Sequence, residues 1–343
     1  MGSKKTTETM KYTDLTIKDK QDIINKVQAE SGLQRQLIEK DWWVTAVLRA
    51  LFALPYSGHM SFKGGTNLSK CWKLINRMSE DADIAIDREY LGFAEPLSKT
   101  QISDKLRRAA CSFVREKLQY DLREQLIKDG IKEEYFSVNV NITPITTTDP
   151  ETIEVAYLPV YSDSEYLRPK VIVEVSGRSM NEPVVPVAIH SFIDDVFKNA
   201  PFTEGDFEVR AVVPQRTFLE KVFLLHEEFA KPYERRRTER MSRHLYDIGQ
   251  MLDTPIADEA LSDEKLYNSV IDHRRTFIGL KGFDYDTLLP KRLNIHLPSE
   301  SYESWKKDYI KMQMSMIYGD SLPFDVLLEK IYALNDRINK IVF

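Results

Sequence analysis

Cysteine is scarce in this 343-residue sequence, in which Cys71 and Cys111 are the two examples. Two thiols so far apart in the chain do not form a metal site by themselves, and they are typical of reduced, buried residues in the cytoplasm. Long apolar runs are also missing, because no stretch approaches the roughly 20 apolar residues that a membrane-spanning helix requires. Residues 1–20 carry no apolar or Arg-rich segment, so we expect no targeting signal. We therefore predict a cytoplasmic protein without a membrane partner.

The sequence also lacks an excess of positive charge. Lys and Arg total 48 against 53 Asp and Glu, which gives a formal net charge of −5. This balance argues against a surface that binds nucleic acid over its whole area, but it leaves room for a local basic channel. Residues 231–243 form one such segment, with six basic residues against Glu234 and Glu239. The segment is either a solvated helix face or a stretch that follows an RNA backbone.

The composition and the length indicate a folded chain with two parts. Apolar residues make up 42% and charged residues 29%, which is typical of a globular protein. The chain is long enough for two packed units. Helical and extended patterns are mixed up to about residue 212, and only helical patterns follow. We predict a core domain at 13–212 that includes the N-terminal helices, and a helical C-terminal domain at 213–343.

Hydrophobic periodicity predicts the individual elements. Strands are expected where side chains alternate or β-branched residues gather, and helices where apolar residues recur three and four positions apart. The predicted strands are 60–62, 81–87, 135–142, 152–161 and 170–176. The predicted helices are 17–30, 33–54, 67–76, 98–128, 216–230, 239–252, 265–278, 299–317 and 324–340.

One constellation carries chemistry: Gly64-Gly65-Thr66, then fourteen residues, then Asp81-Ala82-Asp83. Alternation along a strand places both carboxylates on one face, about 6–7 Å apart along the backbone. Carboxylate oxygens are the ligands that magnesium prefers, supplemented by water and substrate phosphates. A Gly-Gly turn at the start of a helix offers backbone N–H groups to an anion with no side chain in the way. Joined by one short helix, the two motifs predict phosphoryl or nucleotidyl transfer.

Each motif alone is a weak signal. A Gly-Gly-Thr turn is usually an ordinary loop, and Asp-x-Asp is usually a solvated strand edge. The ordered pair, however, resembles the DNA polymerase β-like nucleotidyltransferase superfamily, and the wider pattern resembles the AbiEii/AbiGii toxin family within it. The stretches that carry the resemblance are EKDWWV (39–44), FKGGTNLSK (62–70), RMSEDADIAI (77–86), RPKVIVEV (168–175), TFLEKVFLLH (217–226) and SRHLYDI (242–248).

The resemblance implies an α+β fold: a polymerase β-like nucleotidyltransferase core, in which helices flank a mixed sheet, followed by a C-terminal helical bundle. It places the metal aspartates of the family on Asp81 and Asp83 and a hydroxyl on Ser79. It places the catalytic lysine on Lys221 and a later catalytic aspartate on Asp247. Together with the Gly64, Gly65 and Thr66 turn, Ser79 and Lys221 would bind the nucleotide. The family's usual serine after the threonine is replaced by Asn67.

For three of these positions, the neighbouring residues in the sequence also indicate a role. Glu174 stands between Val173 and Val175, so it is either a third metal ligand or general base, or an exposed strand residue. Lys221 lies on an apolar helix face, where a buried charge needs a partner such as a triphosphate; the alternative is a side chain that reaches solvent. Asp247 either positions Lys221 or the nucleotide, or forms a structural ion pair.

The predicted function is that of a magnesium-dependent nucleotidyltransferase. It would move an NMP from an NTP to an RNA hydroxyl, with tRNA as the expected acceptor. Two Mg²⁺ ions are expected, and Mn²⁺ is an alternative. The resemblance further implies a toxin that acts in phage defence by abortive infection and is paired with a separately encoded antitoxin. The alternatives are an enzyme that modifies a protein hydroxyl and a catalytically silent nucleotide- or RNA-binding module.

Overall fold

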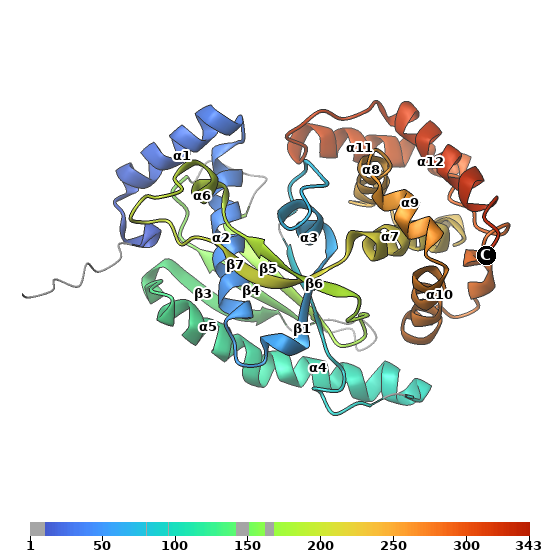
Figure 1. Ribbon diagram of the computed structural model, residues 1–343, viewed down its shortest axis with the longest axis horizontal. Helices are drawn as coiled ribbons and strands as arrows, with labels where there is room; N and C mark the ends of the chain where they lie inside the picture. The colour runs from blue at the N-terminus through green and yellow to red at the C-terminus, as the bar shows by residue number, and fades with distance from the viewer. Residues whose placement is uncertain (1–10, 80, 95, 142–150, 162–167) are drawn as a thin grey trace, which may run out of the picture.

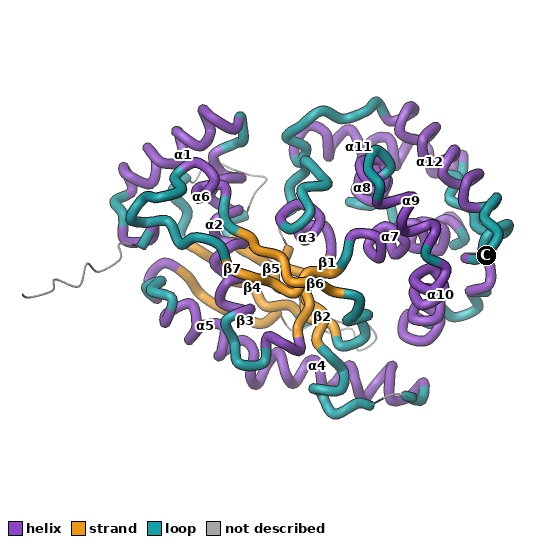
Figure 2. Tube along the Cα trace, in the orientation of Figure 1, coloured by secondary structure: helices purple, strands orange, loops and turns teal. Residues whose placement is uncertain are grey.

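A computed structural model describes residues 11–79, 81–94, 96–141, 151–161 and 168–343. Within these ranges the chain forms a mixed α/β structure around a seven-stranded sheet (Figures 1 and 2). No helix among the described residues is long and apolar enough to cross a membrane. The predicted strand 135–142 reaches beyond the described residues at its last position.

The sheet is mixed in direction and has the strand order β3-β4-β5-β2-β1-β7-β6. Its two central strands, β1 and β2, pair antiparallel, while β2–β5 and β1–β7 pair parallel. The antiparallel pairs β3–β4, β4–β5 and β6–β7 complete the two sides. The strands are β1 (Met60–Lys63), β2 (Asp81–Ile86), β3 (Phe136–Asn141), β4 (Thr152–Tyr157), β5 (Lys170–Ser176), β6 (Val184–Ile189) and β7 (Phe207–Val212).

Helices of the N-terminal part pack on one face of this sheet. The helix α2 (Arg35–Phe52) contacts β2, β5 and β7, and it also contacts α1 (Ile17–Ser31) and α5 (Gln119–Lys128). Alternation in β2 sends Ala82 and Ile84 into this core, where they are fully buried. The side chains of the opposite parity, which include Asp81 and Asp83, are therefore presented on the other face.

The chain after β7 is helical and lies to one side of the sheet, in yellow to red in Figure 1. The helix α7 contacts α8, α9 and α10, and α8 contacts α11 and α12. The helices are α7 (Pro214–Phe229), α8 (Ser242–Met251), α9 (Ile256–Ser262), α10 (Glu264–His273), α11 (Tyr302–Ser315) and α12 (Phe324–Ile338).

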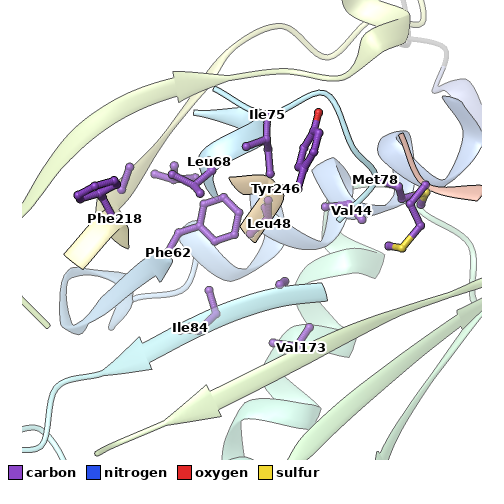
Figure 3. Packing of buried hydrophobic residues seen from close by; sticks show 14 of the residues in the cluster. Val44, Leu48, Phe62, Leu68, Ile75, Met78, Ile84, Val173, Phe218 and Tyr246 are labelled. Carbon is purple, nitrogen blue, oxygen red and sulfur yellow. The ribbon is translucent and has the colours of Figure 1, made fainter. Parts of the chain in front are cut away.

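One continuous cluster of buried side chains joins the two parts of the chain. Figure 3 shows Phe218 of α7 and Tyr246 of α8 packed near Phe62 of β1 and Leu68. A backbone hydrogen bond from the Met78 N–H to the Met316 carbonyl, 2.7 Å long, adds a polar link. The helical part is therefore held against the strands that carry the aspartates. The domain boundary at residue 212 stays a prediction.

The helix between the glycines and the aspartates differs from the expectation of 67–76. The helix α3 spans Gly64–Lys70, so it begins at the glycines and ends early. Lys73 has a left-handed backbone with φ of 54°, which a continuing helix does not allow. The apolar residues whose three- and four-residue spacing predicted a longer helix therefore lie in a turn. The prediction also missed β6, β7 and α9; β6 contains Pro186, which an edge strand tolerates.

Candidate active site

Three carboxylates share one face of the sheet. In the parallel pairing of β2 with β5, Asp83 lies opposite Glu174, and Asp81 lies opposite Ile172 two positions earlier. Because alternate residues of a strand point the same way, Asp81, Asp83 and Glu174 project together. All three are half-buried and line a cleft of about 380 Å³.

The cleft lies between the sheet and the helical part of the chain. Its other wall comes from α7, α8 and α10, so the last third of the sequence faces the carboxylates directly. Lys221 of α7 and Arg243 of α8 line this wall. The structure thus brings together Gly64, Gly65, Ser79 and Lys221 with the three carboxylates.

The glycine turn is shaped by close contact with the aspartate strand. Gly64 has φ of 79°, a left-handed conformation that glycine adopts at no steric cost, and a Cβ there would collide with the Asp83 carboxylate. A Cβ on Gly65 would lie 2.8 Å from both Arg77 Nη2 and Ser79 Oγ. Glycine is therefore required at both positions so that the turn can approach the aspartates and Ser79.

Thr66 does not line the cleft in the way that its glycine neighbours do. Its side chain is buried, its hydroxyl donates to the Asp81 carbonyl, and it lies 2.9 Å from Ser79 Oγ. Thr66 therefore ties the first turn of α3 to the start of β2. Ser79 itself is half-buried and reaches the cleft.

Lys221 is held by a buried ion pair behind the cleft wall. Its ammonium lies 2.8 Å from Asp247 Oδ2, and the exposed fraction of its side chain is 9%. Arg77 binds the same carboxylate in bidentate fashion, with Nε 2.6 Å from Oδ1 and Nη2 2.7 Å from Oδ2. The side chains of Arg77 and Asp247 are 2% and 0% exposed. Asp247 thus bridges two cations in the protein interior.

The charges of this cluster set its protonation. Burial alone would raise the pKa of Asp247, but the adjacent Arg77 and Lys221 lower it well below its usual range. Burial lowers the pKa of Lys221, and Asp247 opposes that effect. Direct contact with a nucleotide requires Lys221 and Asp247 to open onto the cleft. Lys221 does, whereas Asp247 is fully buried and is absent from the described lining.

The carboxylate face combines burial with neighbouring negative charge, and Glu174 shows the effect of both. Burial raises the pKa of Glu174 to about 7, and the negative charges of Asp83 and Asp81 add to this rise. Oxygen donors of this kind fit Mg²⁺ or Mn²⁺. Among the described residues, no three His, Cys, Asp or Glu side chains gather closely enough to enclose a metal ion. Mg²⁺ commonly binds one or two carboxylates and takes its remaining ligands from water and substrate phosphates, so Asp81 and Asp83 meet its requirement.

Several cleft residues were not singled out in the sequence. Thr217, Glu220 and Leu224 line it together with Lys221, at the three- and four-residue spacing of one helix face, so the period of α7 was the available signal. Burial would raise the pKa of Glu220, but the charges of Arg216 and Lys63 lower it to about 2. Glu220 is therefore a fixed negative charge.

Two buried polar atoms in the wall have no partner among the described residues. These are Oγ1 of Thr217 and Nδ1 of His244, and both residues line the cleft. Burial and the charges of Lys221 and Arg243 hold the pKa of His244 well below its usual range. Buried polar groups normally form hydrogen bonds, so these two atoms are available to a water molecule or to a bound ligand.

The basic segment 231–243 is divided in the structure. Lys231 and Arg237 pair with Glu228, and Arg236 pairs with Glu300. Arg243, near the end of the segment, instead lines the cleft. The first part of the segment is thus occupied by structural ion pairs.

Comparison with known proteins identifies the family of the chain. The family described as "Nucleotidyl transferase AbiEii toxin, Type IV TA system" matches residues 46–330. No curated protein matches the chain. Among solved structures, the chain is similar to JHP933 from Helicobacter pylori, with 15% identity, a TM-score of 0.35, and coverage of 89% of this chain and 99% of that one. Because the family match spans most of the sequence, the chain belongs to the AbiEii nucleotidyl transferase toxin family of type IV toxin–antitoxin systems.

Proposed function

We propose that the protein transfers an NMP from an NTP to a hydroxyl of an RNA, with a tRNA end as the expected acceptor. The observation that carries the proposal is the cleft itself, in which Asp81 and Asp83 face Lys221 and two buried polar atoms without partners. A triphosphate needs carboxylates that hold its metal ion on one side and basic side chains that contact its phosphates on the other. The residues of this cleft fit both needs. Its volume of about 380 Å³ suits a small ligand.

Each residue has a distinct part in the proposed reaction. Asp81 and Asp83, with Glu174 beside them, would hold magnesium. When bound, magnesium supplies charge neutralisation at the reacting phosphate and at the attacking oxygen. Gly64, Gly65 and Ser79 would contact phosphate oxygens. The hydroxyl oxygen of the acceptor would bond to the α-phosphorus, its proton would pass to a base, for which Glu174 is available in the cleft, and the bond from that phosphorus to pyrophosphate would break.

Lys221 would stabilise the negative charge that grows on pyrophosphate as it departs. Asp247 would act on Lys221 and not on the substrate, because it is buried behind the wall. Catalysis would then consist mainly of positioning and electrostatics. The strand–turn–helix–strand arrangement of β1, α3 and β2 supports a polymerase β-like core with an appended helical bundle.

The biological role follows from the family. Membership in a type IV toxin–antitoxin family implies a separate antitoxin partner. We propose that the transfer reaction is the toxic activity, that it takes place in the cytoplasm, and that it serves phage defence.

The test is incubation of the purified protein with each labelled NTP, Mg²⁺ or Mn²⁺, and total cellular RNA. We expect label on RNA, dependent on the metal and lost in Asp81→Asn. Label on a protein instead of RNA would support an enzyme that modifies protein hydroxyls. Absence of label with every nucleotide would support a silent binding module.

A further inference from the structure

A second cleft, of about 360 Å³, adjoins the first and shares Asp81 and Arg243 with it. We call it the basic groove. It is lined by six basic residues, which are Lys40, Arg168, Lys170, Arg240, Arg243 and Lys311. They come from α2, the chain entering β5, β5 itself, α8 with the turn before it, and α11. Such a gathering from distant parts of the sequence is built by the fold and not by one charged run.

The acidic residues of the basic groove do not cancel its charge. Asp81, Glu239 and Asp308 are the three acids among its lining residues, and Lys170 is also paired with Glu154, so the six basic residues keep an excess of two positive charges over these four acids. The Asp308 carboxylate accepts hydrogen bonds from the backbone N–H groups of Arg240 and Ser242, so it orders the start of α8. Asp81 belongs to the proposed metal site, where its charge is neutralised in the working enzyme.

The positive charges are presented from both sides. Arg168 is exposed on the side of β5, and Arg240 and Lys311 are exposed on the side of α8 and α11. Half-buried Arg243 stands where the two clefts meet, and it forms no ion pair with any other described residue. Burial and the neighbouring Arg77 and Arg240 lower its pKa, in keeping with a crowd of cations at this junction.

The floor of the basic groove is apolar. Ile172, Met312 and Met316 line it. Methionine adapts its shape to flat, irregular ligands, and cationic rims bind phosphates. Cations on both rims with an apolar floor between them match a single strand of nucleic acid, whose phosphates and bases need these two surroundings. An acceptor lying here would also end at Asp81, where the transfer takes place.

We propose that the basic groove holds the 3′ end of a single-stranded RNA acceptor and delivers its terminal hydroxyl to Asp81. The inference rests on the proposed function and adds the acceptor site to it. A protein acceptor is less well matched, because a cleft of about 360 Å³ admits an extended end and not a folded surface. The partnered arginines at 236 and 237 are not part of this site.

The test measures RNA binding without NTP or divalent metal, so that it does not depend on transfer. Binding of a short fluorescent single-stranded RNA is followed by anisotropy over a salt series. The double variant Arg168→Ser with Lys311→Ser should bind roughly tenfold more weakly, and its log–log salt slope should fall by about 1.4, because two phosphate contacts are lost. The matched control is Lys105→Ser with Arg108→Ser, which removes two exposed cations at the start of α4 (Arg107–Phe113), a helix remote from α8 and α11 in Figure 1. The control should bind as wild type does.

The possible outcomes distinguish a failure of the proposed acceptor site from a failure of the proposed function. Wild-type affinity and slope in the groove variant would overturn the proposed acceptor site, while RNA labelling by the wild type would still stand. A wild type that binds no RNA, or that labels only protein, would also overturn it. Binding of a non-hydrolysable NTP with Mg²⁺ should be equal in the groove variant, the control and the wild type, which shows that the nucleotide cleft is intact. A reduced NTP affinity in the groove variant alone would contradict the separation of the two clefts.

Discussion

The Lys221 ammonium and the Asp247 carboxylate form a buried ion pair 2.8 Å long, although they lie on different helices. The same carboxylate accepts hydrogen bonds from Arg77, which lies shortly before β2 and its two aspartates, the proposed metal ligands. The cluster therefore links the cationic wall of the cleft to the strand that carries Asp81. The Lys221 ammonium is therefore held by a carboxylate that is itself buried and does not line the cleft.

Replacing the members of this cluster should separate chemistry from stability. Lys221→Ala should lower kcat by roughly 10²–10³-fold and leave nucleotide binding less affected, since the charge it offsets grows as pyrophosphate departs. Asp247→Asn leaves two buried cations without a counter-charge, so the free energy of unfolding should fall by about 3–5 kcal/mol. Steady-state kinetics and urea unfolding measure the two effects.

The control for these two variants is Asp41→Asn, which disrupts the buried ion pair between Asp41 and Lys70 in the core. It should destabilise the protein, but the folded fraction should keep its kcat. If Asp247→Asn likewise kept full kcat per folded molecule, Asp247 would have only a structural role.

The carboxylate face gives the second prediction. Asp81→Asn and Asp83→Asn should each abolish transfer, because each removes a proposed metal ligand, while the fold remains intact. Calorimetric titration with Mg²⁺ and a non-hydrolysable NTP should show a large loss of affinity in both. Asp87→Asn, at the end of the same strand, is the control and should behave as wild type; the Asp87 carboxylate accepts a hydrogen bond from the Glu89 N–H. Full activity in Asp83→Asn would contradict the assignment of Asp81 and Asp83 as the two metal ligands.

Much of the sheet side of the site was predictable from the sequence, because it depends on alternation within strands. The side chains of Asp81 and Asp83 share a face for that reason alone, whereas Glu174 joins them because the register of β2 with β5 sets it opposite Asp83. The apolar surroundings of Lys221 correctly indicated that its charge needs a partner. The protein itself supplies that partner in Asp247.

The helical side was less predictable because its contacts join residues far apart in the chain. Arg77 and Asp247 are separated by 170 positions, and no local pattern reports such a pairing. The basic residues of the groove likewise come from four distant segments of the chain. The charge pattern of the sequence indicated only the single basic run 231–243. The polymerase β-like core and the domain boundary at 212 stay predictions.

The glycine turn gives the third prediction. Gly64→Ala combines a left-handed backbone, which costs an L-residue about 1–2 kcal/mol, with a collision against the Asp83 carboxylate. Because this displaces a proposed metal ligand, transfer should fall on the order of a hundredfold. Gly58→Ala is the matched control, since a Cβ there meets no atom within 4 Å. Equal kinetics in the two variants would show that the turn does not need to lie against Asp83.

The last prediction concerns pH and lies away from the cleft, at Glu39 of α2. The side chain is buried, and burial raises its pKa from 4.5 to about 7, although hydrogen bonds from the backbone of Val160 and Tyr161 and the charge of Lys20 oppose the rise. A raised acid pKa means that the folded state holds the proton more tightly than the unfolded state. Stability is therefore full below about pH 4.5 and declines as the pH rises to about 7, by on the order of 3 kcal/mol.

Glu39→Gln should remove this dependence, because glutamine keeps an oxygen that can accept the 2.7 Å hydrogen bond from the Val160 N–H and carries no charge at any pH. Measured by urea unfolding, the variant should gain on the wild type as the pH is raised from 4.5 to 8, by on the order of 3 kcal/mol. Glu30→Gln, exposed near the end of α1, is the control and should follow the wild type across the same range. Tyr12 and Lys20 face the same carboxylate, whose charge raises the pKa of each, so Glu39→Gln removes this coupling together with the titration of Glu39. A constant difference between Glu39→Gln and wild type would mean that Glu39 ionises in the folded protein as readily as in the unfolded chain.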